Sequence, residues 1–229
     1  MHGFDGFPPQ TLPFLQKLAR NNQREWFNNH KTDYEAYVRE PALVFIEEMA
    51  PKLKGISNQF HAIAKKSGGS LMRVYRDTRF SKDKTPYKTN IGIQFRHLLG
   101  KDVHAPGFYL HIENSGCFLG AGIWHPESKT LGKIRNFIVD NPASWRKINQ
   151  SNPFKSQFEL SGESLKRAPK GFSPDHPLIE DLKRKDFIAI MSFECNQINR
   201  SDFTDFVIHE FQRTDEFMRY LCAAVEVNY

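Results

Sequence analysis

Histidines and one glutamate in the middle of the chain have the chemistry to move protons or to bind a metal ion. Histidines recur every seven residues at positions 97, 104 and 111, and Glu113 and His125 follow them. Because imidazole titrates near neutral pH, a positioned histidine can act as a general acid or base. The candidate catalytic residues are therefore His104, His111, Glu113 and His125.

The spacing within this group leaves several roles open. Glu113 lies two residues after His111, so both share one face if the segment is a strand. Two histidines and a carboxylate could hold a divalent metal ion for hydrolysis, but no helical His-Glu-x-x-His pattern accompanies them. Hydrogen-bonded structural histidines, general acid or base catalysis and a metal-assisted hydrolase all remain, and no cofactor or metal site is predicted from a motif.

A second group of residues could bind an anion. Between residues 65 and 96, nine basic residues stand against the two acidic residues Asp77 and Asp83, and the rest of the chain is nearly neutral. A compact cationic cluster focuses positive potential, whereas dispersed lysines only aid solubility. The basic residues are Lys65, Lys66, Arg73, Arg76, Arg79, Lys82, Lys84, Lys88 and Arg96.

Residues 73–88 have the composition of a preorganised anion site. Arginine binds phosphate or carboxylate through parallel hydrogen bonds, and the interleaved aromatic rings could stack on a base or on a guanidinium. The aspartates could hold the arginines in place; the alternative is a solvated basic loop with ordinary ion pairs. The candidate ligand-binding residues are Arg73, Tyr75, Arg76, Asp77, Arg79, Lys82, Lys84, Tyr87 and Lys88.

The elements that must position these residues fall into three regions. Residues 8–56 have helical periodicity, with a break at Asn21-Asn22 and a kink or junction at Pro41. The centre, 61–196, carries residues 73–88, which we call the basic segment, and holds short runs of β-branched and aromatic residues bounded by turn residues. A final helix is predicted over 201–225.

The central runs predict an antiparallel sheet. Strands are expected at 71–76, 91–96, 107–113, 117–124 and 187–193. Asn114-Ser115-Gly116 separates two of them, which is typical of a β-hairpin, and residues 151–175 predict an extended loop. The expected fold is a single α+β domain over residues 1–229, with a mainly antiparallel sheet of about five strands and N- and C-terminal helices packed on it.

The overall composition predicts an ordinary soluble globular protein. The chain has 229 residues, a net charge of +6 and 39% hydrophobic residues. Its start resembles no secretory signal, and no segment is apolar for long enough to span a membrane, so we expect a cytoplasmic protein. Cys117, Cys195 and Cys222 fit neither a disulfide framework nor a Cys-x-x-Cys zinc site, and each is predicted to be a buried small apolar side chain.

Several motifs resemble one known family. The 18-residue run from Arg73 to Asn90 and the segments 106–109 and 120–126 carry the resemblance, with further similarity at 21–27, 139–142, 169–172 and 175–178. Over nearly its whole length the chain resembles the family called domain of unknown function 2461. The resemblance implies a single cytosolic domain and brings no activity, cofactor or catalytic residue with it.

These patterns predict a protein that binds a phosphate-bearing or other anionic ligand, a nucleotide or nucleic acid, at the basic segment. Hydrolytic or transfer chemistry on that ligand is a natural extension. The alternatives are a metal-assisted hydrolase that uses the central histidines and a module that binds an acidic protein partner. If the basic segment is a site, its cations should surround one concavity, because their potentials overlap only within about a Debye length, roughly 8 Å.

Overall fold

A five-stranded antiparallel sheet forms the centre of the protein in a computed structural model that describes residues 3–100 and 105–229. The strand order is β1-β2-β3-β5-β4. The strands are β1 (Ile91–Arg96), β2 (Gly107–Ile112), β3 (Cys117–Ile123), β4 (Glu159–Ser161) and β5 (Phe187–Phe193). The predicted single α+β fold with N- and C-terminal helices on an antiparallel sheet is confirmed.

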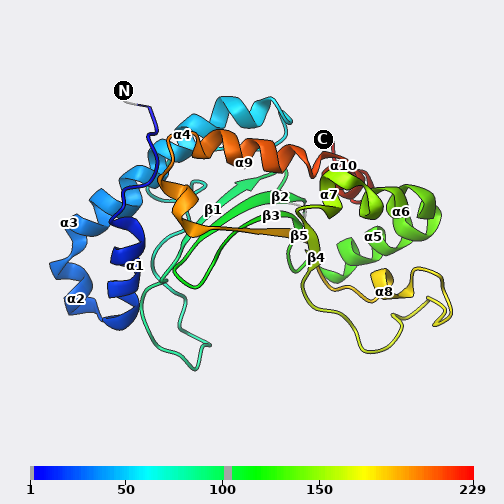
Figure 1. Cartoon of the computed structure of the whole chain (residues 1–229). Coiled ribbons are helices and arrows are strands. Elements are labelled where there is room, and N and C mark those ends of the chain that lie inside the picture. The colour runs from blue at the N-terminus through cyan, green and yellow to red at the C-terminus, as the bar shows by residue number, and fades with distance from the viewer. Residues whose placement is uncertain (1–2, 101–104) are drawn as a thin grey trace.

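Helices from both ends of the chain cover one face of this sheet (Figure 1). The covering helices are α4 (Glu40–Lys54), α9 (Phe203–Gln212) and α10 (Asp215–Ala224). To one side lie α1 (Thr11–Arg20), α2 (Arg24–Asn29), α3 (Lys31–Tyr34) and a π-helical turn, Glu35–Arg39. To the other side lie α5 (Ser128–Asp140), α6 (Pro142–Gln150), α7 (Asn152–Lys155) and α8 (Ile179–Leu182), and a short 3-10 helix, Cys195–Asn199, follows β5.

The two faces of the sheet differ because side chains alternate along each strand. On β2, Phe108, Leu110 and Ile112 are fully buried, and the Phe108 ring centroid lies 4.6 Å from that of Phe211 on α9. The intervening Tyr109 and His111 point to the opposite face, which we call the open face. Among the described residues, no helix lies across the open face (Figure 1).

The predicted junction at Pro41 is a π-helical turn that runs directly into α4. Proline has no N–H, so it cannot donate to the carbonyl of Tyr37 four residues earlier. The hydroxyl of Thr11 on α1 donates to that carbonyl instead, at 2.6 Å. A hydrogen bond from α1 therefore satisfies the carbonyl that Pro41 leaves without a helical donor, and it joins α1 to the π-helical turn.

One predicted strand was wrong and one real strand was not predicted. Residues 71–76 form only isolated bridges, Leu71 to Ile93 and Tyr75 to Tyr87, so the partner changes within a few residues and no ladder develops. In contrast, β4 lies inside the expected loop 151–175. It is three residues long and depends on pairing with β5, a long-range contact that local composition does not encode.

The predicted C-terminal helix is divided into α9 and α10. The division falls at Thr214, a fully buried residue whose hydroxyl donates to the Phe211 carbonyl at 2.7 Å. A threonine side chain bonded to a nearby carbonyl competes with the helical ladder, and a second helix starts immediately afterwards. None of the helices that the structure describes is long and apolar enough to cross a membrane.

The prediction for the cysteines was wrong for two of the three. Cys117 and Cys195 form a disulfide, while Cys222 is free and buried. The pairing follows from the sheet register, because Cys117 at the start of β3 is opposite Phe193 at the end of β5. Sequence spacing gave no sign of this, since 78 positions separate the two cysteines.

Candidate functional site

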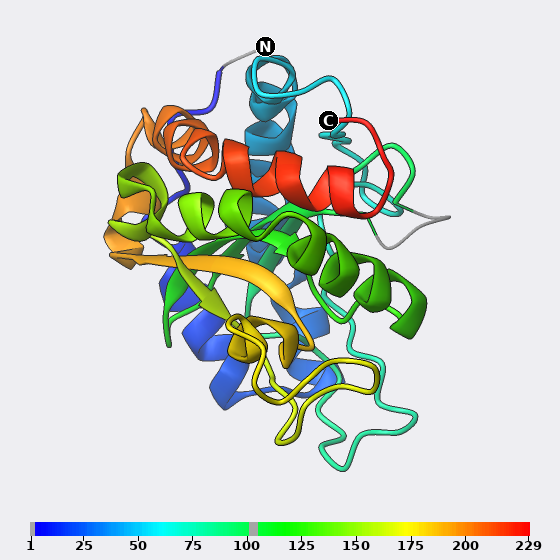
Figure 2. The same cartoon turned by 90° about the vertical axis from the view of Figure 1, so that its right-hand side faces the viewer.

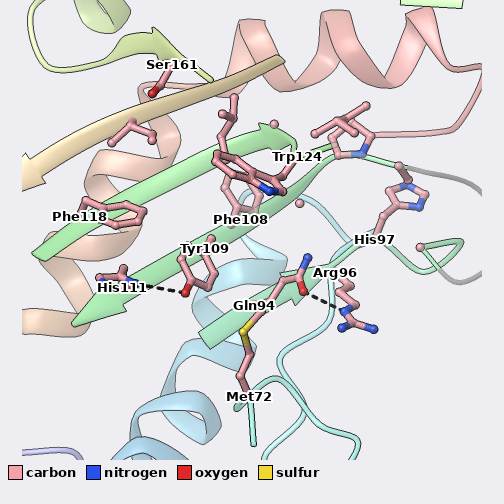
Figure 3. Close-up of a pocket in the computed structure, with 18 residues that line it drawn as sticks. Met72, Gln94, Arg96, His97, Phe108, Tyr109, His111, Phe118, Trp124 and Ser161 are labelled. Carbon is pink, nitrogen blue, oxygen red and sulfur yellow. Dashed lines mark hydrogen bonds between the residues drawn. The ribbon is translucent and has the colours of Figure 1, made fainter. Parts of the chain in front are cut away.

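A cavity of about 570 Å³ lies on the open face of the sheet (Figure 3). This volume is within the range of small-molecule sites. Most of its lining is aromatic or aliphatic, and a few polar groups converge on it, which is the usual composition of a ligand pocket. The residues that matter below are Gln94, Arg96, Tyr109, His111, Phe118 and Trp124.

A glycine on β1 makes room for the hydroxyl of Tyr109. A Cβ atom at Gly92 would lie 2.7 Å from Tyr109 Oη, closer than real Cβ contacts allow, and 3.0 Å from Met72 Sδ, tighter than most of them. Gly92 pairs with His111 across the β1–β2 ladder, so its missing side chain leaves the space beside the two polar residues of β2. The missing side chain of Gly92 therefore makes room for the cavity at this wall.

Tyr109, His111 and Glu113 form a hydrogen-bonded series along one face of β2. His111 Nε2 lies 3.4 Å from Glu113 Oε2, and His111 Nδ1 lies 3.3 Å from Tyr109 Oη. Because an ionised carboxylate only accepts, Nε2 carries the proton and Nδ1 is the acceptor that the Tyr109 hydroxyl and the Asn90 amide both face. The Phe118 ring stacks on the imidazole, with centroids 4.5 Å apart.

Glu113 is fixed and ionised by its neighbours. The Thr89 hydroxyl donates to it at 2.6 Å and the Ser115 hydroxyl at 2.9 Å. Burial alone would raise the pKa of Glu113, but the hydrogen bonds from Thr89, Ser115 and His111 outweigh it and hold the pKa below its ordinary value. Two short side chains thus keep a carboxylate charged behind the histidine.

The other two groups of the series are neutral at physiological pH. Burial lowers the pKa of His111, with Glu113 opposing the shift, so the imidazole is unprotonated at one nitrogen. Burial also raises the pKa of Tyr109, with the Asn90 amide opposing, so the phenol keeps its proton. The series therefore rests as carboxylate, neutral imidazole and phenol, which is the arrangement that a base relay needs.

Arg96 and Lys88 lie beside the cavity, and neither forms an ion pair with a carboxylate among the described residues. Arg96 lines the cavity and its Nε donates to Gln94 Oε1 at 3.1 Å, as Figure 3 shows. Lys88 Nζ lies 4.0 Å from Sδ of Met72, another lining residue. Burial lowers the pKa of Lys88, and the nearby Arg73 adds to the shift, so a bound anion would relieve both effects.

The rest of the basic segment forms a loop that is braced from within, residues 76–86, which we call the basic loop. Its two arms run antiparallel, with the Arg76 N–H bonded to the Pro86 carbonyl at 2.9 Å and Lys88 N–H to the Val74 carbonyl at 2.7 Å. Lys84 Nζ donates to the Thr78 carbonyl at 2.8 Å. These bonds hold the loop in one shape without a β-ladder.

The aspartates of the basic loop hold two of its arginines, as the sequence indicated. The Arg76 guanidinium contacts Asp83 and Thr85, and Arg79 makes two side-chain hydrogen bonds to Asp77, at 3.0 and 2.7 Å. Arg76 is the first cause of a pKa of about 2 at Asp83. The charges of Arg76 and Arg79 are therefore neutralised in part by Asp83 and Asp77 within the loop.

The nine predicted ligand-binding residues do not surround one common cavity. Arg76, Tyr87 and Lys88 line a hollow of about 340 Å³, while Arg73 is exposed and lies near Lys88. Tyr87 is buried against Phe27, with centroids 4.1 Å apart, and Tyr75 is half-exposed. The remaining members, Asp77, Arg79, Lys82 and Lys84, belong to the outer part of the basic loop. That these residues bind an anion stays a prediction.

His125 lies apart from the Tyr109–His111–Glu113 series and pairs with a buried aspartate. Its Nδ1 is 3.2 Å from Asp186 Oδ1, and the same oxygen accepts the His125 backbone N–H at 2.8 Å. The Glu163 N–H donates to the other oxygen of Asp186 at 2.9 Å. These bonds from Asp186 connect β4, β5 and the end of β3, and a catalytic role of His125 stays a prediction.

The remaining candidate, His104, lies outside the described residues. Within 3–100 and 105–229, no three residues among His, Cys, Asp and Glu are arranged to hold a metal ion. The predicted proximity of His111 and Glu113 is present, whereas His125 binds Asp186 instead.

Comparison with known proteins identifies the family. The model of the family described as Conserved hypothetical protein (DUF2461) matches residues 10–220. The chain belongs to this family. No curated protein and no solved structure matches it. The resemblance seen in the 73–90 run is therefore confirmed over nearly the whole chain.

The contributions of Asn90, Tyr109 and Asp186 were not predicted. Tyr109 precedes His111 by two residues, so the alternation that placed Glu113 beside His111 also placed Tyr109 there. Asn90 Nδ2 lies 3.4 Å from His111 Nδ1, and its position depends on the pairing of β1 with β2. No local pattern marks Asn90 or Asp186, because both reach partners distant in sequence.

Proposed function

We propose that this protein binds a phosphate-bearing or other anionic ligand on the open face of the sheet and transfers or hydrolyses a group on it. The observation that carries the proposal is the Glu113–His111–Tyr109 series at the wall of the cavity. A carboxylate behind a neutral histidine, with a phenol in front, is an arrangement that accepts a proton at Tyr109 Oη. Arg96, Lys88 and Arg73 supply the positive charge for the ligand.

The chemistry proceeds by a proton relay. As a water molecule attacks phosphorus, its proton passes to Tyr109 Oη while the Tyr109 proton passes to His111 Nδ1. The imidazolium that results is stabilised by the Glu113 carboxylate. The new bond joins the water oxygen to phosphorus, and the bond from phosphorus to the leaving oxygen breaks on the opposite side. The leaving oxygen takes its proton from solvent, and His111 then releases the proton that it accepted to solvent.

A panel of chromogenic phosphomonoesters and phosphodiesters tests the proposal. We expect turnover by the wild-type protein, and Tyr109→Phe and His111→Gln should each lower kcat by about 100- to 10,000-fold, the usual effect of losing a general acid or base. KM should change little. The matched control is Tyr37→Phe, because Tyr37 lies in the π-helical turn and does not line the cavity, and its hydroxyl makes no hydrogen bond with the described residues.

The outcomes separate chemistry from binding. Equal kcat in the wild type and in both cavity variants, with folding intact by circular dichroism, would assign the turnover to another site. An unchanged kcat with a raised KM in Arg96→Gln would support the role of Arg96 in holding the anion.

A further inference from the structure

The most exposed large apolar side chain that the structure describes is Phe80, at 96%. It stands on the outer part of the basic loop, and the Arg79 guanidinium lies 5.9 Å from its ring centroid. A ring this exposed adds no core packing, and it leaves a large π-face in solvent. A partner that stacks on an aromatic ring beside positive charge fits this position.

The basic loop presents this ring on a braced support. The bonds that Arg76, Arg79 and Lys84 make within the loop fix its shape, and both aspartates of the loop are paired with these arginines. Lys82 is exposed and forms no ion pair with any described residue. Phe80 is thus held outward beside unneutralised positive charge, which lowers the entropy cost of binding a polyanion.

A second basic segment, residues 166–170, flanks the open face from the opposite side. Figure 1 shows residues 162–178 and the basic loop extending below the sheet from its two ends, and Figure 2 places both beyond the same face. Lys166, Arg167 and Lys170 of this segment are exposed, and within 3–100 and 105–229 they pair with no carboxylate. Positive charge therefore lies on both sides of the cavity.

Between the two basic segments, aromatic rings line the sheet. Trp124, at the end of β3, lines the cavity and is 55% exposed. Tyr109 on β2 and Phe118 on β3 line the same cavity, with Phe118 toward the opposite end of β3 from Trp124 (Figure 3). Aromatic side chains on an antiparallel sheet are a recurrent platform for unpaired bases, with flanking cations on the phosphates.

We propose that the open face binds a single-stranded nucleic acid. Bases stack on Phe80 and Trp124, and backbone phosphates contact Lys82 and the cations of residues 166–170. This rests on the proposed function, because it names the phosphate-bearing ligand as a polymer. Paired bases offer no free face to these rings, and an anionic bilayer surface offers no aromatic faces that could stack on them.

Fluorescence anisotropy with labelled twelve-nucleotide dT and rU strands tests the proposal, with a hairpin duplex as competitor. We expect single strands to bind more tightly than duplex. Phe80→Leu and Trp124→Leu should each weaken binding about 5- to 150-fold, the range of one base–aromatic stack, and Phe80→Tyr should retain it. Phe80 is exposed, so its variants leave the fold intact.

Salt dependence tests the phosphate contacts. The double variant Lys166→Gln/Arg167→Gln should lower the magnitude of the slope of log K against log salt by about 0.7 for each lost contact. Lys54→Gln, an exposed lysine on α4 in the helical layer over the other sheet face, should leave affinity and slope unchanged.

Three results would overturn the proposal: no strand binding at low salt, equal affinity for duplex, or binding that Lys54→Gln weakens as much as the double variant. Phosphatidylserine vesicle binding that Phe80→Leu abolishes, with strand binding unaffected, would identify a membrane surface instead. Turnover of small phosphoesters without strand binding would overturn this inference and leave the proposed function standing. Strand binding without phosphoester turnover would support this inference and overturn only the group-transfer step of the proposed function.

Discussion

The Arg76 side chain braces the basic loop through Asp83 and Thr85. Hydrogen bonds from Arg76, then from the Thr85 N–H and hydroxyl, favour the ionised carboxyl and bring the pKa of Asp83 to about 2. We expect a carbon-detected NMR titration of Asp83 to show its midpoint near pH 2 in the wild type. In Arg76→Gln the midpoint should move toward the ordinary value of 3.8.

Arg79→Gln provides the matched control for this titration, because Arg79 bonds to Asp77 and not to Asp83. It should leave the Asp83 midpoint in place. A wild-type midpoint near the ordinary value would mean that Arg76 does not hold the loop.

His111 gives the stability of the protein a pH dependence of defined sign. Its pKa in the folded state lies below the ordinary 6.5, because burial disfavours the imidazolium more than Glu113 favours it. As pH falls through that range, the unfolded chain takes up a proton before the folded protein does, so the free energy of unfolding decreases. Glu113, whose pKa is also lowered, adds a loss of the same sign at lower pH.

Urea unfolding at a series of pH values measures this dependence. Between about pH 7 and pH 5, the His111→Gln variant should lose less stability than the wild type, because one proton-linked group is gone. The other histidines contribute equally to both proteins and cancel in the difference. Parallel curves for the two proteins would rule out a depressed pKa at His111.

The strand β1 shapes the cavity through Gly92, which gives a prediction about packing. Gly92→Ala places a Cβ atom 2.7 Å from Tyr109 Oη and 3.0 Å from Met72 Sδ. Both atoms are the ends of flexible side chains, so the fold can adjust at a cost of about 1 kcal/mol or less. Tyr109 must move, however, and kcat on the best phosphoester should fall about 10- to 100-fold.

Gly132→Ala on α5 is the control for this substitution, because nothing lies within 4 Å of a Cβ atom there. It should preserve kcat and raise the stability slightly, since alanine favours a helix over glycine. If Gly92→Ala keeps full kcat, the position of the Tyr109 hydroxyl is not important for turnover.

Most strands could be predicted because their own residues carry the signal. β2 alternates buried and half-buried residues, and the turn residues Asn114-Ser115-Gly116 of its hairpin with β3 are visible in the sequence. β4 could not be predicted, because its three residues are held by backbone pairing with β5. The same reason accounts for the disulfide, whose two cysteines meet only when β3 and β5 pair.

The candidate site follows the same division. The proximity of His111 and Glu113 followed from their spacing on one strand, because strand periodicity is a local property. The polar neighbours Thr89 and Asn90 directly follow the basic segment. They lie more than twenty positions before Glu113 and His111 in the sequence, and only the sheet register brings them together. The sequence therefore identified the central histidines and the basic segment as candidates, but not the hydrogen bonds from Thr89 and Asn90 that reach Glu113 and His111.

Across the whole molecule, the packed core and the candidate site lie on opposite faces of the sheet. One face packs under α4, α9 and α10, and the other carries the cavity, the Tyr109–His111–Glu113 series and two flanking basic segments (Figures 1 and 3). Residues on the open face can therefore be changed with little loss of core packing. That separation makes functional variants of this protein interpretable.

NMR mapping of bound phenyl phosphate locates the ligand directly. In a titration of nitrogen-15-labelled protein, we expect the resonances of Gln94, Tyr109 and His111 and the Trp124 indole to shift together with one dissociation constant. Resonances of the covering helices α9 and α10 should stay in place. Saturable shifts elsewhere on the surface, with the cavity resonances unmoved, would contradict binding on the open face of the sheet.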